Sequence, residues 1–168
     1  MALLKADNLV KKFGGVTAVD DFSLEVEEKQ IVGIIGPNGA GKTTIFNLLS
    51  KVYIPDSGRI FLQNSEITGC SQEQVSIAGM ARTFQNIRLF EGLNVLQNVK
   101  VACDYKPRYG ILEAVLLFPR RFKGEAKISE EAAQCLKLVG LEHLAHEKPG
   151  NLPYGLQRRL EIARALAM

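Results

Sequence analysis

The chain has 168 residues, of which 46% are hydrophobic and 23% are charged, and its net charge is +3. This length and composition are those of one ordinary globular domain with a real core. The charge is too small to indicate nucleic acid as a partner, and none is predicted. No apolar run approaches the ~20 residues of a membrane helix, and Lys5 and Asp7 interrupt the N-terminus where a signal peptide needs an apolar core. The sequence therefore predicts a cytosolic protein.

The three cysteines, Cys70, Cys103 and Cys135, are odd in number and widely spaced. They form no CxxC pair, so the sequence predicts neither a disulfide framework nor a cysteine metal site. We expect reduced thiols in small core or surface positions.

The first part of the chain predicts strands over residues 1–35, followed by a helix. β-Branched and apolar residues stand between polar ones at 16–26, and the apolar run IVGII at 31–35 suits a strand buried on both faces. Gly36 to Gly41 breaks that strand. A helix is expected over 42–50, with an apolar side made of Ile45, Leu48 and Leu49.

The rest of the chain changes from α/β to α-rich. The turn cluster 55–58 predicts a following strand at 59–63, and a second short strand is expected at 81–84. From about residue 94 the pattern is helical, including ILEAVLLF at 111–118. A further helix is expected from Ser129, as its cap, to Gly140, with an apolar stripe of Ala132, Ala133, Leu136 and Val139.

The segment GPNGAGKTT fits the phosphate-binding pattern G-x-x-x-x-G-K-[ST], with a predicted strand before it and a predicted helix after it. Glycines let backbone N–H groups curl around an anion, and the helix N-terminus adds its positive dipole end. Lys42 would bring a charge to the β- and γ-phosphates, and the Thr43 hydroxyl would ligate Mg²⁺. The predicted ATP-binding residues of this phosphate loop are Gly36, Pro37, Asn38, Gly39, Ala40, Gly41, Lys42, Thr43 and Thr44.

Four motifs in order carry a family resemblance. They are FGG at 13–15, the phosphate loop, RTFQN at 82–86 and LPYGLQRRLEIARAL at 152–166. From residue 4 to its end the chain resembles the ATP-binding subunit of ABC transporters. RTFQNIRLFEGLNVLQNV, the later YGILEAVLLFPRR and a Tyr-Gly signature are similar to the LivG-type subunit of branched-chain and hydrophobic amino-acid importers.

The resemblance implies an α/β fold: a P-loop NTPase (RecA-like) core with an N-terminal antiparallel β subdomain and an α-helical subdomain. It implies one incomplete ATP-binding domain over 1–168, in which the C-terminal part of the core is missing. Residues 1–87 would hold the β subdomain, the phosphate loop and the Q-loop (82–86). Residues 88–168 would hold the helical subdomain and the signature helix.

The resemblance also implies further site residues. Phe13 would stack on adenine, and Gln85 would sense Mg²⁺ and the γ-phosphate, so that the metal contacts are Thr43 and Gln85. The signature segment would face the ATP of a partner subunit through Leu152, Pro153, Tyr154, Gly155, Leu156 and Gln157.

The implied function is the energy-coupling subunit of an importer, driven by hydrolysis of Mg-ATP at a dimer interface. The partners would be a second ATP-binding subunit, identical or different, membrane permease subunits and, indirectly, a periplasmic or extracellular solute-binding protein. The protein would lie at the cytoplasmic face of the membrane. Alternatives are a truncated nucleotide-binding remnant without ATPase activity, or an ABC-type ATPase outside transport.

The sequence departs from the family pattern at several places. Pro153 replaces the usual signature Ser, and Leu156 replaces a polar residue, so weaker γ-phosphate contacts are expected. Three residues stand where the family often has Gly and would be strained at positive φ: Lys29, Lys51 and Asn64. The family's Walker B Asp, catalytic Glu and switch His have no counterpart in 1–168, so no catalytic residue is assigned and the chain alone is expected to be inactive.

Two groups of carboxylates are assigned no role. Asp20 and Asp21 are expected in a solvated turn between strands. Three glutamates are expected at exposed helix positions: Glu130, Glu131 and Glu161.

Overall fold

The computed structural model describes residues 2–103 and 119–168, the latter without the side chains of 119–124. The described chain forms two compact units, Met1–Met80 and Ala81–Met168. The division falls before residue 81 and not before residue 88, so the Q-loop belongs to the second unit. The helix predicted at 111–118 lies outside the described residues.

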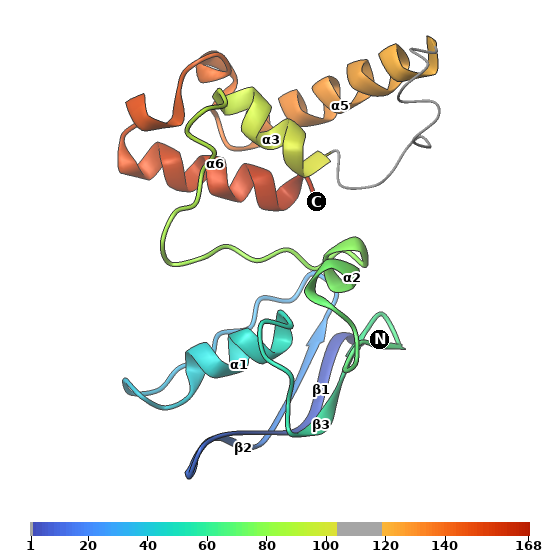
Figure 1. Ribbon diagram of the computed structural model, residues 1–168, viewed down its shortest axis with the longest axis vertical. Coiled ribbons are helices and arrows are strands. Elements are labelled where there is room, and N and C mark those ends of the chain that lie inside the picture. The colour runs from blue at the N-terminus through green and yellow to red at the C-terminus, as the bar shows by residue number, and fades with distance from the viewer. Residues whose placement is uncertain (1, 104–118) are drawn as a thin grey trace. The chain divides into compact units, whose positions relative to one another are not determined.

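The first unit is built on an antiparallel sheet of order β2-β1-β3-β4 (Figure 1). A long hairpin joins the first two strands, whose register runs from the pair Ala2 and Glu27 to the pair Phe13 and Val16. The strands are β1 (Ala2–Phe13), β2 (Val16–Glu27), β3 (Ser57–Leu62) and β4 (Ser65–Glu66). Strand β3 therefore confirms the strand predicted after the turn cluster at 55–58.

Helix α1 (Lys42–Leu49) packs on this unit as its apolar pattern predicts. Ile45, Leu48 and Leu49 are buried and share one core with strand residues such as Leu9 and Ile60. This local pattern is sufficient to place the helix that follows the phosphate loop.

Helix α2 (Gln72–Ile77) is an element that the sequence analysis did not predict. Ser71 accepts a hydrogen bond from the Gln74 N–H, and the Gln74 side chain accepts one from the Ser71 N–H. This reciprocal pair is a capping box, a signal that can be read from sequence as Ser followed three residues later by Gln.

Two predicted strands are wrong. Residues 31–35 are described but lie in no strand, and the side chains of Ile31 and Ile35 are 98% and 94% exposed. A strand buried on both faces needs neighbours on both edges, and the described residues supply none to this segment. Residues 81–84 also form no strand. Asp20 and Asp21 lie within β2 and not in a turn, although both are exposed as expected.

The turn before β3 depends on the Asp56 carboxylate. It accepts hydrogen bonds from the Lys11 ammonium at 2.9 Å and from the Lys12 N–H at 2.6 Å. The bonds from Lys11 and Lys12 lower the pKa of Asp56 below its ordinary value of 3.8. The ionised carboxylate therefore stabilises the native state above pH 3.8, and this contribution is lost as the pH falls through the lowered pKa.

We expect Asp56→Asn to lower stability more at pH 6 than at acidic pH, because the contribution of the ionised carboxylate is lost as the pH falls through its lowered pKa. Urea midpoints of both proteins, measured from pH 2 to pH 6, test this. Curves that stay parallel over the whole range would contradict it.

The second unit is helical. It comprises α3 (Val95–Cys103), α5 (Pro119–Leu138), the short η1 (Glu142–Leu144) and η2 (Pro149–Asn151), and α6 (Tyr154–Leu166) (Figure 1). Its core is made by buried residues of α3, α5 and α6, including Val95, Val99, Ala132, Leu136 and Leu160.

Helix α5 confirms one expectation and corrects two. Gly140, at φ 70°, follows the helix end as predicted. Ser129 is not a cap, because α5 begins at Pro119 and the Ser129 hydroxyl donates to the Glu125 carbonyl inside the helix. Ala133 is exposed, and the buried stripe instead includes Ile128 one turn before Ala132.

The Asn98 side chain of α3 binds the backbone of the loop that precedes this helix. The side chain is completely buried, its oxygen accepts from the Phe90 N–H, and its nitrogen donates to the carbonyls of Phe90, Leu93 and Asn94. A buried amide with this many backbone partners is costly to remove, because each partner is then left without a hydrogen bond.

We expect Asn98→Ala to lower the free energy of unfolding by about 2–4 kcal/mol. Gln134→Ala removes an exposed amide from α5 and is expected to change stability by less than about 0.5 kcal/mol. Chemical denaturation of both variants measures the difference. Equally small changes in the free energy of unfolding for the two variants would show that the Asn98 hydrogen bonds make no net contribution to stability.

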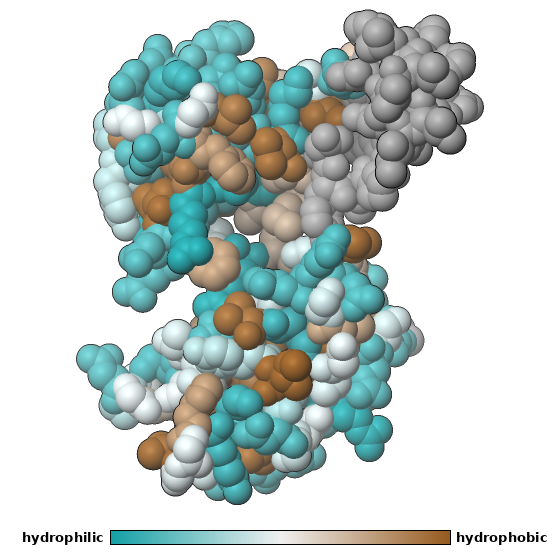
Figure 2. Space-filling model, viewed as in Figure 1, coloured by the Kyte–Doolittle hydropathy of each residue, from teal (hydrophilic) through white to brown (hydrophobic). Residues whose placement is uncertain are grey.

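On the face shown in Figure 2, apolar side chains are scattered among polar ones. In the described part of the chain, no helix is both long and apolar enough to cross a membrane. The three cysteines differ in exposure, with Cys103 buried and the other two half-buried.

Candidate nucleotide site

The phosphate loop forms an open cradle in the first unit. Residues 36–40 are exposed, and Gly41 precedes α1 in a left-handed conformation with φ 81°. The first N–H groups of α1 have no acceptor within the helix and lie at its positive dipole end. The Ile45 N–H is the first to donate back, to the Gly41 carbonyl at 2.9 Å. The N–H groups of Lys42, Thr43 and Thr44 therefore remain available to an anion.

The Lys42 ammonium lies within this cradle. It donates to the carbonyl oxygens of Gly36 and Pro37, at 2.7 and 2.6 Å. The side chain thus folds back over the loop, with its charge held by two neutral acceptors. A phosphate would offer the same ammonium a charged acceptor, and charge-assisted hydrogen bonds are the stronger kind.

Gly41 is required where the loop meets the sheet. A Cβ atom at this position would lie 2.3 Å from the Ala18 carbonyl oxygen, and φ is 81°. Only glycine avoids both the contact and the left-handed strain. The close approach fixes the end of the phosphate loop against β2.

Phe13 lies on the β1–β2 hairpin, which also carries Ala18. It pairs with Val16, which stands two residues before Ala18 along β2, so the β1–β2 register brings the aromatic side chain near the end of the cradle. The ring is 44% exposed and packs edge-on against Tyr53 at 5.2 Å. An exposed aromatic held on one side is suited to stacking on a base, and the role of Phe13 stays a prediction.

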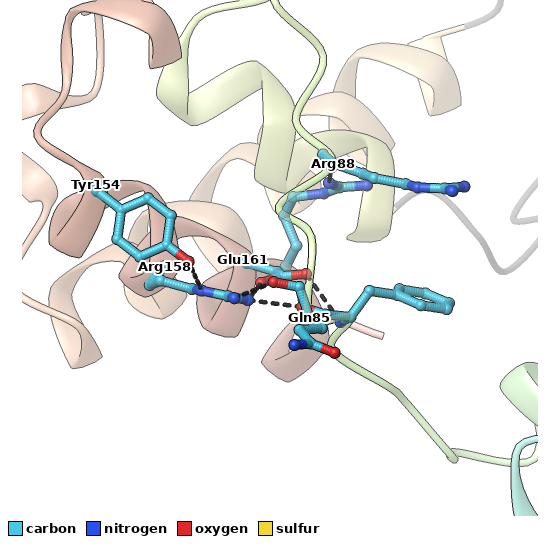
Figure 3. Close-up of polar contacts among 7 residues, drawn as sticks. Gln85, Arg88, Tyr154, Arg158 and Glu161 are labelled. Carbon is cyan, nitrogen blue, oxygen red and sulfur yellow. Dashed lines mark hydrogen bonds and ion pairs between the residues drawn. The ribbon is translucent and has the colours of Figure 1, made fainter. Parts of the chain in front are cut away.

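In the second unit, Gln85 presents its side chain to solvent while its backbone is bound. The residue is exposed, and its carbonyl accepts a hydrogen bond from Arg158 of α6. Figure 3 shows the Arg158 guanidinium beside this carbonyl. Gln85 is therefore fixed through its main chain, while the residue is exposed and its side chain can meet a ligand.

The signature segment forms the start of α6. Leu152 is buried, Pro153 occupies the N-cap position, and Tyr154 is 65% exposed. The N–H groups of Tyr154 and Gly155 lie in the first turn, before Leu156 donates back to the Pro153 carbonyl. Because Pro153 lacks a side-chain hydroxyl, anion contacts at this end would come from the backbone alone.

Two side chains of the signature segment contact the protein itself and are not placed to bind an anion. Gln157 donates to the Leu152 carbonyl at 2.9 Å, which closes the turn, and Leu156 packs against the helical core. The backbone of Gly155 is the part of the segment best placed to meet a phosphate.

The three residues that stand where the family often has Gly all have positive φ angles. Lys29, Lys51 and Asn64 have φ values of 62°, 59° and 66°. Lys51 is also buried, and desolvation lowers its pKa while its ammonium donates to the Thr68 carbonyl at 2.5 Å.

Magnesium would be held mainly by the nucleotide. Within residues 2–103 and 119–168, no group of three or more His, Cys, Asp or Glu side chains is arranged to hold a metal ion. The exposed Thr43 hydroxyl in the first turn of α1 fits an ion that keeps most of its ligands from water and phosphate.

One carboxylate expected at the surface is buried. Glu161 of α6 is only 8% exposed, accepts from the Phe84 N–H at 3.0 Å and pairs with Arg158 at 2.8 Å. The partner segment lies 77 residues earlier, a contact that no local pattern reveals. Glu130 is exposed as expected, and Glu131 is half-buried.

Comparison with known proteins places these features in one family. A family model described as ABC transporter matches residues 19–168. The high-affinity branched-chain amino acid transport ATP-binding protein LivG of Salmonella typhimurium is 41% identical over 164 residues, covering 98% of this chain and 64% of LivG. The chain therefore spans somewhat less than two thirds of the length of this relative.

The solved structures that resemble this fold are also ATP-binding cassettes. An ATP-binding cassette of an ABC transporter in its ADP conformation has a TM-score of 0.82 and 32% identity, over 99% of this chain and 65% of that one. A dimeric ATP-binding cassette bound to ADP and Pi, in a post-hydrolysis state, has a TM-score of 0.74 and 29% identity, over 98% and 69%. The family match includes the phosphate loop, the Q-loop and the signature segment in one stretch, and the chain therefore belongs to the ABC transporter family.

Proposed function

We propose that the protein is the ATP-binding, energy-coupling subunit of an ABC importer for branched-chain amino acids. The observation that carries this is the open phosphate loop, with N–H groups available at the start of α1 and the Lys42 ammonium bonded to the carbonyls of Gly36 and Pro37. Similarity to LivG supports the transport role and the class of solute.

In this proposal each unit contributes a different part of the reaction. The phosphate loop binds the β- and γ-phosphates, Phe13 stacks on adenine, and Thr43 and Gln85 contact Mg²⁺. The backbone at Gly155 meets the γ-phosphate of ATP held by a partner subunit. The Mg²⁺ ion would neutralise phosphate charge during hydrolysis.

The proposed partners follow from the same family. The dimeric cassette with ADP and Pi supports a second ATP-binding subunit, whether identical or different. Membrane permease subunits would receive the conformational change at the cytoplasmic face, and a solute-binding protein outside that membrane would deliver the amino acid. A nucleotide-binding remnant without ATPase activity and an ABC-type ATPase outside transport are the competing functions.

Uptake of radiolabelled leucine in the source cells tests the proposal. Deleting the gene should abolish the high-affinity, ATP-dependent part of leucine uptake, and the natural gene on a plasmid should restore it. A Lys42→Ala gene, expressed at the same level, should not restore uptake. Full uptake in the deleted strain would contradict the importer role, while leaving ATP binding to be measured separately.

A further inference from the structure

Three side chains of α6 hold the backbone of the irregular segment 84–88. Arg158 donates to the carbonyls of Phe84 and Gln85, and Glu161 accepts from the Phe84 N–H. One turn further along, Arg164 donates to the Arg88 carbonyl. A segment without regular structure must find partners for its backbone groups elsewhere, and here one helix supplies them.

Arg158 is the centre of this arrangement (Figure 3). Its Nε donates to the Tyr154 hydroxyl at 3.2 Å, and one terminal nitrogen donates to both the Phe84 carbonyl, at 2.6 Å, and Glu161, at 2.8 Å. The other terminal nitrogen donates to the Gln85 carbonyl. A single guanidinium therefore joins a signature residue to the Q-loop, using donors in a rigid planar fork that lysine cannot reproduce.

Glu161 keeps that guanidinium in place. Its carboxylate is buried and has two donors, the Phe84 N–H and Arg158, so its negative charge is both paired and hydrogen-bonded. The hydrogen bonds that Arg158 donates to Tyr154 and Glu161 raise its pKa. A buried carboxylate is costly unless it is paired and hydrogen-bonded. The Glu161 side chain therefore makes a specific contact and does not belong to a solvated helix face.

We propose that Arg158 and Glu161 are positioning residues that hold the Q-loop backbone on the signature helix, so that Gln85 and Gly155 move as one body. Resting on the proposed ATPase function, this gives the helix a second role besides presenting Gly155. Because Arg158 contacts both the Gln85 carbonyl and Tyr154, a displacement of the Q-loop backbone is transmitted within this unit to the N-terminal end of α6.

Hydrogen exchange tests the contact itself, without any activity. In Glu161→Ala the Phe84 amide loses its acceptor, and its exchange should become at least tenfold faster. Glu161→Gln keeps an acceptor oxygen and should show a smaller increase. Glu130→Gln, an exposed change on α5, should leave the rate unchanged. Equal Phe84 exchange in all four proteins would overturn the proposal.

A double-mutant cycle tests the coupling in the natural full-length ATPase with its permease. Arg158→Lys should lower kcat about tenfold with the KM for ATP unchanged, because the phosphate loop is intact. In a Gln85→Ala background the same change should have little further effect, since both residues act through one step. The exposed neighbour Arg159→Lys serves as the control and should retain normal kcat.

The outcomes separate this proposal from the proposed function. Additive losses in kcat, together with unchanged Phe84 exchange, would show that Arg158 is merely structural. An unmodified protein that hydrolyses no ATP would contradict the proposed function, and the exchange rates at Phe84 would still decide whether the contact exists.

Discussion

Lys42→Ala is expected to weaken Mg-ATP binding by at least about 100-fold, close to 3 kcal/mol of binding free energy. The Lys42 ammonium is the cationic side chain of the phosphate loop, and it is held only by two loop carbonyls. Removing it leaves the N–H groups and helix dipole in place but takes away a full charge from the β- and γ-phosphates.

Isothermal titration with Mg-ATP measures this loss. Lys137→Ala removes an exposed lysine from α5 in the other unit and should bind like the unchanged protein. Thermal unfolding without nucleotide should be nearly the same for both variants, because Lys42 makes no buried contact that a core depends on. If Lys42→Ala bound Mg-ATP normally, the loop would not be the phosphate site.

Gly41→Ala is expected to disrupt both stability and binding. The added methyl group would lie 2.3 Å from the Ala18 carbonyl oxygen, and a non-glycine residue at φ 81° adds left-handed strain. The chain must shift where the loop meets β2, at a cost of about 2–4 kcal/mol in unfolding free energy. The same shift moves the first N–H groups of α1 and should weaken Mg-ATP binding more than tenfold.

Gly69→Ala is the matched control for this change. A Cβ at Gly69 meets nothing within 4 Å, and φ there is not in the left-handed region. Urea unfolding and Mg-ATP titration of both variants should therefore separate a specific requirement at Gly41 from a general effect of losing a glycine. Similar stability of the two variants would contradict the close approach at Ala18.

Local signals predicted much of the first unit. The apolar pattern of 42–50 places α1, and the turn cluster at 55–58 places β3, because both depend on neighbouring residues in the sequence. The capping box at Ser71 was a local signal too, and it was missed. The strand expected at 31–35 failed because a central strand is defined by its neighbours across the sheet, which no local pattern contains.

In the candidate site too, local sequence patterns predict contiguous features but not contacts between distant segments. The phosphate loop could be predicted from its own residues, since glycines, a lysine and a following helix are contiguous in the chain. Glu161 was expected at the surface because a glutamate in a polar helix stretch usually is exposed. Its burial depends on Phe84, and only the fold brings these residues together. The resemblance singled out Lys29, Lys51 and Asn64 as positions where the family often has glycine, and the positive φ that would strain them is found at all three.

The most direct test of the account is the response of backbone amides to a non-hydrolysable Mg-ATP analogue, followed by NMR on the protein. We expect the largest shifts at the amides of residues 39–44, where free N–H groups and Lys42 form the cradle. Smaller shifts are expected at Phe13. Saturable binding that leaves the amides of 39–44 unchanged would contradict the central claim that this loop holds the phosphates of ATP.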